Sequence, residues 1–317
     1  MNPLQRLRAR RREREEPLID VETIPRRRLT IVLAIAVGLA SLPMLITYIL
    51  LILTSFSNTA GMLTISDLAH YVPTIQPWID FLEGKVEPTA GHLYTTMEIL
   101  GIILNTLIVA AGVSIVVVLT STMAGYAFSR IRFRGRKALM QLVMILHAFP
   151  GVALIIAVYA LYVWSLAALP PSAWNTYAFI YVILSRASLE IPMSIWLMKG
   201  FFDKIPWEVE WAAIVDGASR IRVWREIVLP LVKPGIAALS IFAFLAGWED
   251  FIYVWVFLKP RDIYTLATFI EEQVRNLETA YFPVVAAAGT LYLIPTIIFF
   301  ITTQHLLLET YAGGMKA

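Results

Sequence analysis

Long uncharged apolar runs alternate with short charged segments along this chain of 317 residues. A helix of about 20 apolar residues matches the hydrocarbon thickness of a bilayer. The apolar runs predict six membrane-spanning helices, at about 29–56, 99–128, 138–165, 176–198, 234–257 and 283–307. The pattern therefore predicts an all-α membrane protein in which residues 29–308 form one transmembrane domain.

Proline separates the third predicted span from the fourth. Residues 138–185 contain no Asp, Glu, Lys or Arg, and this stretch is too long for one span. The Pro170-Pro171 pair divides this stretch, because proline in the interior of a helix breaks or kinks it. Pro150 is expected to kink the third span. The polar, proline-containing segment 57–96 is expected to be an extramembrane loop.

Composition supports a membrane protein. Charged residues make up 15% of the chain and hydrophobic residues 58%, whereas soluble domains carry about 25% charged residues. The chain has no cysteine, which excludes disulfides, thiolate metal sites and cysteine nucleophiles. The first apolar run is too long for a signal-peptide core, so no cleavage is expected.

Positive charge predicts the orientation, because Lys and Arg are enriched in cytoplasmic loops. Of the 26 Lys and Arg residues, 21 fall in the two tails, the second-to-third loop and the fourth-to-fifth loop. Four fall in the other three loops, and Arg186 lies within a span. Both termini are therefore expected in the cytoplasm, as a basic tail at 1–28 and a short tail at 309–317.

The basic tail contains the run RLRARRREREE. Basic runs can bind nucleic acid, but this run also contains Glu13, Glu15 and Glu16 and lacks interleaved aromatic residues. We expect no nucleic-acid partner. A solvated tail, or one associated with lipid headgroups, fits better.

The fourth-to-fifth loop, 199–233, contains a predicted amphipathic helix over Pro206–Ala218. Its apolar residues recur at helical spacing, at Trp207, Trp211, Ile214, Val215 and Ala218. Pro206 suits a first helical turn, and Asp216-Gly217 is a stop signal. A helix here could cover the ends of the spans or act as a lever for a partner, and spacing alone does not choose.

The residues that follow resemble a specific motif. Nine residues separate Gly217 from the run Ile227 to Pro230. This spacing is similar to the second half of the EAA loop in permease subunits of binding-protein-dependent ABC importers. Four further segments resemble the carbohydrate-uptake branch of that family, specifically the maltose-type second permease: NTLIVA (105–110), GYAFSRIRFRGRK (125–137), FPGVALI (149–155) and AGGMKA (312–317). The resemblance covers about residues 95–317.

The resemblance implies that loop 199–233 carries a coupling helix that contacts an ATPase subunit. The implied contact residues are Glu210, Trp211, Ala212, Ala213, Asp216, Gly217, Ala218 and Ser219. The family usually has Glu where this chain has Trp211. Either Glu210 or Glu208 replaces that carboxylate, or Trp211 fills the ATPase cleft by apolar contact.

The resemblance also implies a function and partners. The chain would be a permease subunit of an ATP-driven importer, moving a sugar or a related polyol or glycerol derivative by alternating access. It would act in a bacterial or archaeal cytoplasmic membrane with a second, homologous permease and a periplasmic or lipid-anchored solute-binding protein. The sequence contains no G-x-x-x-x-G-K-[ST] loop. ATP and Mg would therefore be bound by two ATPase subunits, and this chain would have no catalytic residues and no cofactor of its own.

Polar residues within spans are costly and mark candidate pathway positions. They are Asn105, His147, Arg186, Glu190, Trp248, Glu249, Asp250 and Tyr253. Arg186 and Glu190 lie four residues apart and can pair along one helix face. The last four residues are expected to form one polar aromatic cluster, suited to sugar C–H groups and hydroxyls.

Two of these residues have open roles. His147 can line the pathway or hydrogen-bond a neighbouring helix, and the same choice holds for Asn105. The four His residues are scattered without ligand spacing, so we expect no metal site.

Two other classes of protein remain as alternatives. In an ion-coupled secondary transporter, Arg186, Glu190, Glu249 and Asp250 would form a relay, but such folds often contain internal repeats and none is evident here. An intramembrane hydrolase would need a nucleophile and a base on adjacent spans. No such motif is found.

Overall fold

The computed structural model describes residues 26–59, 61–85, 94–275 and 281–314, with side chains described between 28 and 302. All secondary structure in these residues is helical, which confirms the all-α prediction. The predicted basic tail, 1–28, lies outside the described residues except for its last three.

The chain divides into two compact units, Met1–Leu50 and Leu51–Ala317. Most of α2 (Arg26–Thr54) belongs to the first unit. Its residues Arg28–Thr54 are long and apolar enough to cross a membrane. The second unit contains all the remaining helices.

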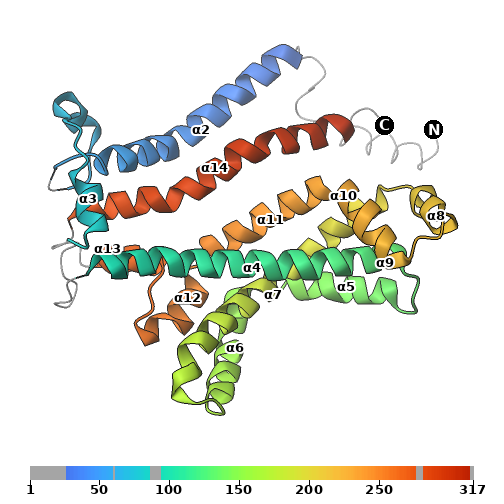
Figure 1. Ribbon diagram of the computed structural model, residues 1–317. Coiled ribbons are helices and arrows are strands. Elements are labelled where there is room, and N and C mark those ends of the chain that lie inside the picture. Colours follow the sequence, from blue (N-terminus) through green and yellow to red (C-terminus); the bar gives the residue numbers. More distant parts are fainter. Residues whose placement is uncertain (1–25, 60, 86–93, 276–280, 315–317) are drawn as a thin grey trace, which may run out of the picture. The chain divides into compact units, whose positions relative to one another are not determined.

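Three long helices form the centre of the second unit (Figure 1). They are α4 (Thr96–Arg130), α7 (Trp174–Asp203) and α11 (Lys233–Trp248). Small residues let them approach closely. A Cβ on Gly125 would lie 2.8 Å from the Cβ of Met198, and one on Gly247 would lie 2.8 Å from the Cα of Ala110.

The predicted third span is two helices rather than one. Helix α5 (Arg136–His147) ends before Pro150, and α6 (Gly151–Leu166) leaves it at an angle of 95°. Proline lacks the N–H that a continuous helix would need, and Gly151 follows it at once. The kink expected at Pro150 is therefore a full break between two helices, and the single span at 138–165 stays a prediction.

The predicted fifth span, 234–257, is also interrupted. Helix α11 ends at Trp248, and the chain becomes helical again in α12 (Ile252–Phe257). The Asp250 carboxylate accepts hydrogen bonds from the backbone N–H groups of Tyr253 and Val254, at 3.0 and 3.2 Å. Asp250 thus caps the first turn of α12, which explains why the break falls at Glu249 and Asp250.

The number of spans depends on how bent helices are treated. Four described helices are each long and apolar enough to cross a membrane. A bent pair, α5 with α6, could form another span. So could α11 with the segment before it, α9 (Arg220–Val223), η5 (Trp224–Val228) and α10 (Leu229–Leu231), which meets α11 at 75°. The structure supports four to six spans, so the six-span count stays a prediction.

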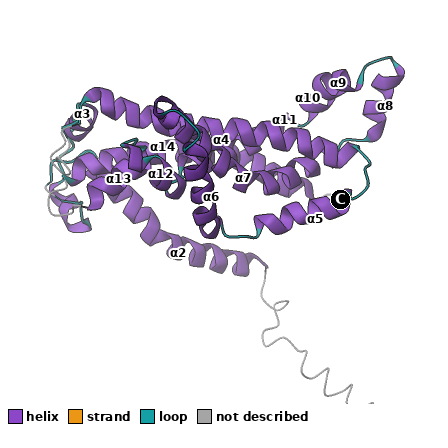
Figure 2. Cartoon of the chain, turned by 90° about the horizontal axis from the view of Figure 1, so that it is seen from below, coloured by secondary structure: helices purple, strands orange, loops and turns teal. Residues whose placement is uncertain are grey.

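Several connecting segments lie at the two ends of α4 (Figures 1 and 2). The first end carries α3 (Gln76–Leu82) and α13 (Leu266–Arg275), and the other carries α8 (Trp207–Val215) and α9. Three short helices lie elsewhere in the connections: η2 (Ile65–His70), η4 (Pro171–Ala173) and η6 (Lys259–Arg261). The last helix, α14 (Phe282–Gly314), continues through residues expected to form a tail from 309.

Candidate functional site

The amphipathic helix predicted in loop 199–233 is present as α8. Pro206 precedes its first residue and Asp216 caps its last. Gly217 then has φ +87°, in the left-handed region where residues with a Cβ are strained. Ser219 begins the next helix, because its hydroxyl accepts a hydrogen bond from the N–H of Arg222 at 3.3 Å.

Glu210 points into the protein. Its carboxylate pairs with Nε of Arg130 at 2.5 Å and accepts a hydrogen bond from the hydroxyl of Tyr126 at 3.1 Å. Arg130 also donates to the carbonyl of Ile205 at 2.7 Å, and its guanidinium lies 4.7 Å from the ring centre of Trp207. Glu210 is therefore held inside this chain and has little surface left for a partner.

One side of α8 is apolar and exposed. Trp211 is 53% exposed and Val215 is 82% exposed, while Ile214 packs against the core of the chain. The other predicted coupling residues are exposed at 212, 216, 217 and 219 and half-buried at 213 and 218. Exposed apolar residues gathered on one side of a helix mark an interaction surface. Among the alternatives for this loop, the geometry favours contact through Trp211.

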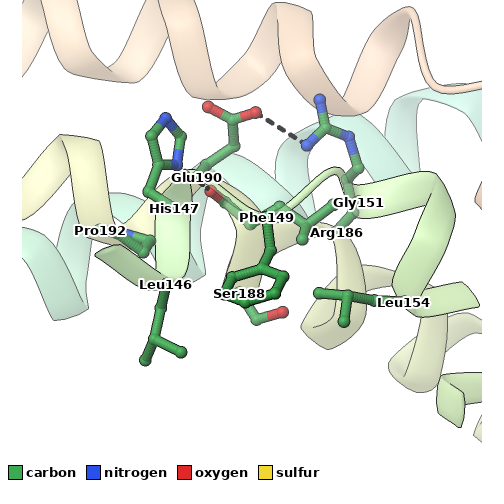
Figure 3. A pocket seen from close by; sticks show the side chains of 10 residues that line it. Leu146, His147, Phe149, Gly151, Leu154, Arg186, Ser188, Glu190 and Pro192 are labelled. Carbon is green, nitrogen blue, oxygen red and sulfur yellow. Dashed lines mark hydrogen bonds and ion pairs between the residues drawn. The ribbon is translucent and has the colours of Figure 1, made fainter. Parts of the chain in front are cut away.

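A cavity of about 510 Å³ lies at the break between α5 and α6, against α7 (Figure 3). Its polar lining includes His147, Arg186 and Glu190, and its apolar lining includes Phe149 and Leu154. The sequence predicted the three polar residues as pathway candidates but placed His147 on the third span and the other two on the fourth. The break at Pro150 brings them to one cavity.

Arg186 links two carboxylates at this cavity. Its Nη1 pairs with Oε1 of Glu190 at 2.8 Å, which confirms the pairing expected from their spacing. Its Nε lies 2.9 Å from Oδ2 of Asp250 and 3.1 Å from the carbonyl of Ala246. Asp250 is almost fully buried, whereas the Glu190 side chain is 32% exposed.

Of the polar aromatic cluster predicted at Trp248, Glu249, Asp250 and Tyr253, the last two are in contact, because the Asp250 carboxylate accepts from the Tyr253 N–H. Trp248 is buried and donates to the carbonyl of Tyr292 at 2.9 Å. Glu249 accepts from the hydroxyl of Thr296, whereas the Tyr253 hydroxyl donates to the carbonyl of Gly151. The side chains of Trp248, Glu249 and Tyr253 thus have separate partners, because the chain leaves the helical path after Trp248.

His147 and Asn105 both bridge between elements. Nδ1 of His147 lies 3.1 Å from the carbonyl of Leu189 in α7, and His147 also lines the cavity. Nδ2 of Asn105 donates to the carbonyl of Tyr264 at 2.9 Å, in the segment before α13. Asn105 is not among the residues that line the cavity. In the described part of the chain, no group of three His, Asp or Glu side chains is placed to hold a metal ion.

Sequence reasoning missed Arg130 as a partner for Glu210. It counted Arg130 only as one of the charges that set orientation. Arg130 is the last residue of α4 and is 8% exposed. Its position as a charged residue at the end of an apolar run was the available signal.

Comparisons with known proteins agree with this architecture. The chain is 34% identical over 213 residues to the maltodextrin transport system permease protein MdxG of Bacillus subtilis, covering 67% of this chain and 74% of that protein. It is 28% identical over 280 residues to the maltose/maltodextrin transport system permease protein MalG of Vibrio vulnificus, covering 86% and 91%.

A solved structure shares the fold. A bacterial ABC transporter involved in the import of the acidic polysaccharide alginate has a chain that matches with a TM-score of 0.62 at 19% identity, covering 92% of this chain and 99% of that one. Residues 116–308 match the family described as binding-protein-dependent transport system inner membrane component. The chain belongs to this family of inner-membrane transport components.

Proposed function

We propose that this chain is a permease subunit of an ABC importer for a sugar or a related polyol or glycerol derivative. The observation that carries the proposal is the exposed apolar side of α8, in the loop with the Gly217 to Pro230 spacing. Family membership supports the importer class. The maltodextrin and maltose permeases among its relatives support a carbohydrate substrate.

The proposed complex contains four kinds of subunit. Two ATP-binding subunits supply the hydrolysis of ATP with Mg and contact α8, and a second permease pairs with this chain in the membrane. A solute-binding protein, periplasmic or lipid-anchored, delivers the substrate on the opposite side. Both termini and α8 lie in the cytoplasm, as the distribution of Lys and Arg predicts.

In this proposal, movement of α8 is transmitted to the membrane helices through Arg130. The ion pair with Glu210 ties α8 to the end of α4, which packs along both α7 and α11. Closure of the ATPase pair on α8 would therefore move these helices together and change the side to which the pathway opens.

Of the predicted pathway residues, we assign His147, Arg186 and Glu190 to the pathway. These three line the cavity at the α5–α6 break. Trp248 has a partner within the protein and is almost fully buried, and Asp250 serves as a cap and as an anchor for Arg186. An ion-coupled relay is less favoured, because the relatives are components of binding-protein-dependent systems.

Uptake driven by different energy sources tests the proposal. Right-side-out membrane vesicles containing the complex and its binding protein would be loaded with ATP or energised by an ion gradient alone. Uptake of radiolabelled maltotriose, or of another ligand of the binding protein, should require internal ATP and resist a protonophore. Uptake driven by the gradient alone would favour the secondary transporter.

A further inference from the structure

We propose that Glu190 sets the charge selectivity of the cavity at the α5–α6 break, so that the cavity accepts neutral, hydroxyl-rich ligands and excludes carboxylated ones. The inference rests on the proposed transport function for its biological meaning. The charge and hydrogen-bonding capacity of the cavity follow from the structure itself.

The charges around the cavity do not cancel. Arg186 is the one basic residue of the group, and it contacts two carboxylates, those of Glu190 and Asp250. Asp250 is committed to Arg186 and to the backbone of α12, and its side chain is 8% exposed. Two carboxylates against one guanidinium leave a surplus of one negative charge. It resides on Glu190, the more exposed of the two acids.

Apart from Arg186, whose Nη2 keeps N–H donors, the polar groups of the cavity accept hydrogen bonds rather than donate them. The Leu189 carbonyl can only accept, so Nδ1 of His147 carries the proton in this contact. In the neutral imidazole, Nε2 is then an acceptor. Glu190 uses Oε1 for Arg186, and its Oε2 has no hydrogen-bond donor among the described residues.

This pattern suits hydroxyl groups. A saccharide hydroxyl can donate to Glu190 Oε2 or to His147 Nε2, whereas an ionised carboxylate has no proton to donate. A carboxylate would also meet the charge of Glu190 in a cavity with an apolar lining, where like charges repel more strongly than in water. The exposed Phe149 ring offers a face for the C–H side of a sugar. The shared fold with an alginate importer therefore does not imply an acidic substrate here.

The absence of native cysteine allows a direct test. Ser188 lines the cavity two residues before Glu190, and Ser188→Cys introduces the chain's only thiol. The full chain, with its partner subunits, would be labelled in native membranes by cationic and anionic methanethiosulfonates of similar size. Modification of the thiol at position 188 is followed on the gel band of this chain alone. The labelling rate of each reagent is divided by its rate with a small free thiol, which corrects for the difference in reactivity between the reagents.

We expect the corrected cationic rate to exceed the anionic rate by about fivefold, the effect of one nearby unit charge in a wet cavity. Glu190→Gln should bring the ratio close to one, and Glu190→Asp should preserve it. Equal rates or faster anionic labelling in the Ser188→Cys chain would overturn the proposal, even if Glu190→Gln fails to accumulate. So would a ratio that Glu190→Gln leaves unchanged.

A second arm separates this inference from the proposed function. Maltotriose should slow labelling of Cys at position 188, and a trimer of galacturonic acid should not. Protection by the acidic trimer alone would overturn the charge selectivity. A charge-dependent ratio without protection by either sugar would retain the electrostatic claim while counting against carbohydrate transport through this cavity.

Discussion

Arg130 at the end of α4 and Glu210 in α8 form a buried ion pair across 80 residues of sequence. Their side chains are 5% and 6% exposed. Desolvation opposes such a pair, and the attraction compensates only when the remaining hydrogen bonds are made. Here Ile205 accepts from Arg130, and Tyr126 donates to Glu210. The pair therefore fixes α8 to α4 in one arrangement.

Glu210→Ala should loosen α8 strongly. It leaves the Arg130 charge buried without a carboxylate, and breaking a buried pair in this way costs about 3–5 kcal/mol. We expect faster amide hydrogen exchange in α8 and a lower Tm of the purified complex. Glu208→Gln is the matched control, because Glu208 is exposed on the same helix.

The double variant Arg130→Met with Glu210→Leu separates packing from charge. Replacing a buried pair by apolar side chains is often neutral for stability. The double variant should therefore recover most of the lost protection in α8. If it is as unstable as Glu210→Ala alone, the ion pair itself is not the cause of the loss.

Trp211→Ala should weaken the association with the ATP-binding subunit and leave the permease folded. Trp211 is 53% exposed on the apolar side of α8, and loss of an aromatic anchor costs about 2 kcal/mol, or roughly 30-fold in affinity. Titration of purified ATPase against nanodiscs measures it. Trp164→Ala is the control, since Trp164 is 78% exposed in α6. Equal losses in the two variants would refute docking through Trp211.

Gly217→Ala should destabilise the connection between α8 and α9. A Cβ at Gly217 would meet nothing within 4 Å, so any cost comes from its φ of +87° alone. The left-handed conformation costs a residue with a Cβ about 1–2 kcal/mol. Gly200→Ala has equal space in α7 and an ordinary φ, so it should be neutral or stabilising. Amide hydrogen exchange in α8 and α9 should be faster in Gly217→Ala and unchanged in Gly200→Ala.

Acidification should weaken the attachment of α13. Burial raises the pKa of Glu271, but hydrogen bonds from Lys259 and Arg275 outweigh it and hold the pKa below its ordinary 4.5. A lowered folded-state pKa adds stability that is present above pH 4.5 and is lost as the pH falls through the folded value. The Tm difference between the native protein and Glu271→Gln should therefore shrink as the pH falls below 4.5. A difference that is constant with pH would exclude this contribution.

Local signals made α8 predictable, and the lack of such signals explains the errors. Pro206 and Asp216-Gly217 mark the ends of α8 in the sequence itself. The size of the bend at Pro150 could not be predicted. Hydropathy does not distinguish one continuous apolar helix from two helices that meet at 95°. Its angle depends on packing against α7.

The site was predictable only where partners are close in sequence. The pairing of Arg186 with Glu190 follows from a spacing of four residues. Asp250 joins them from another helix, and its place depends on the break after Trp248. No local pattern reveals such a contact, so the sequence identified Asp250 as a charged residue without its pairing to Arg186.

The most direct test of the account is ATP hydrolysis by the reconstituted complex in lipid nanodiscs, with its solute-binding protein present. The panel would contain malto-oligosaccharides, polyols, glycerol phosphates and an acidic oligosaccharide. The account predicts stimulation by a neutral saccharide or polyol and loss of that stimulation in Glu210→Ala. Failure of any ATPase subunit to bind the chain would contradict the account. Hydrolysis that responds to the acidic ligand alone would also contradict it.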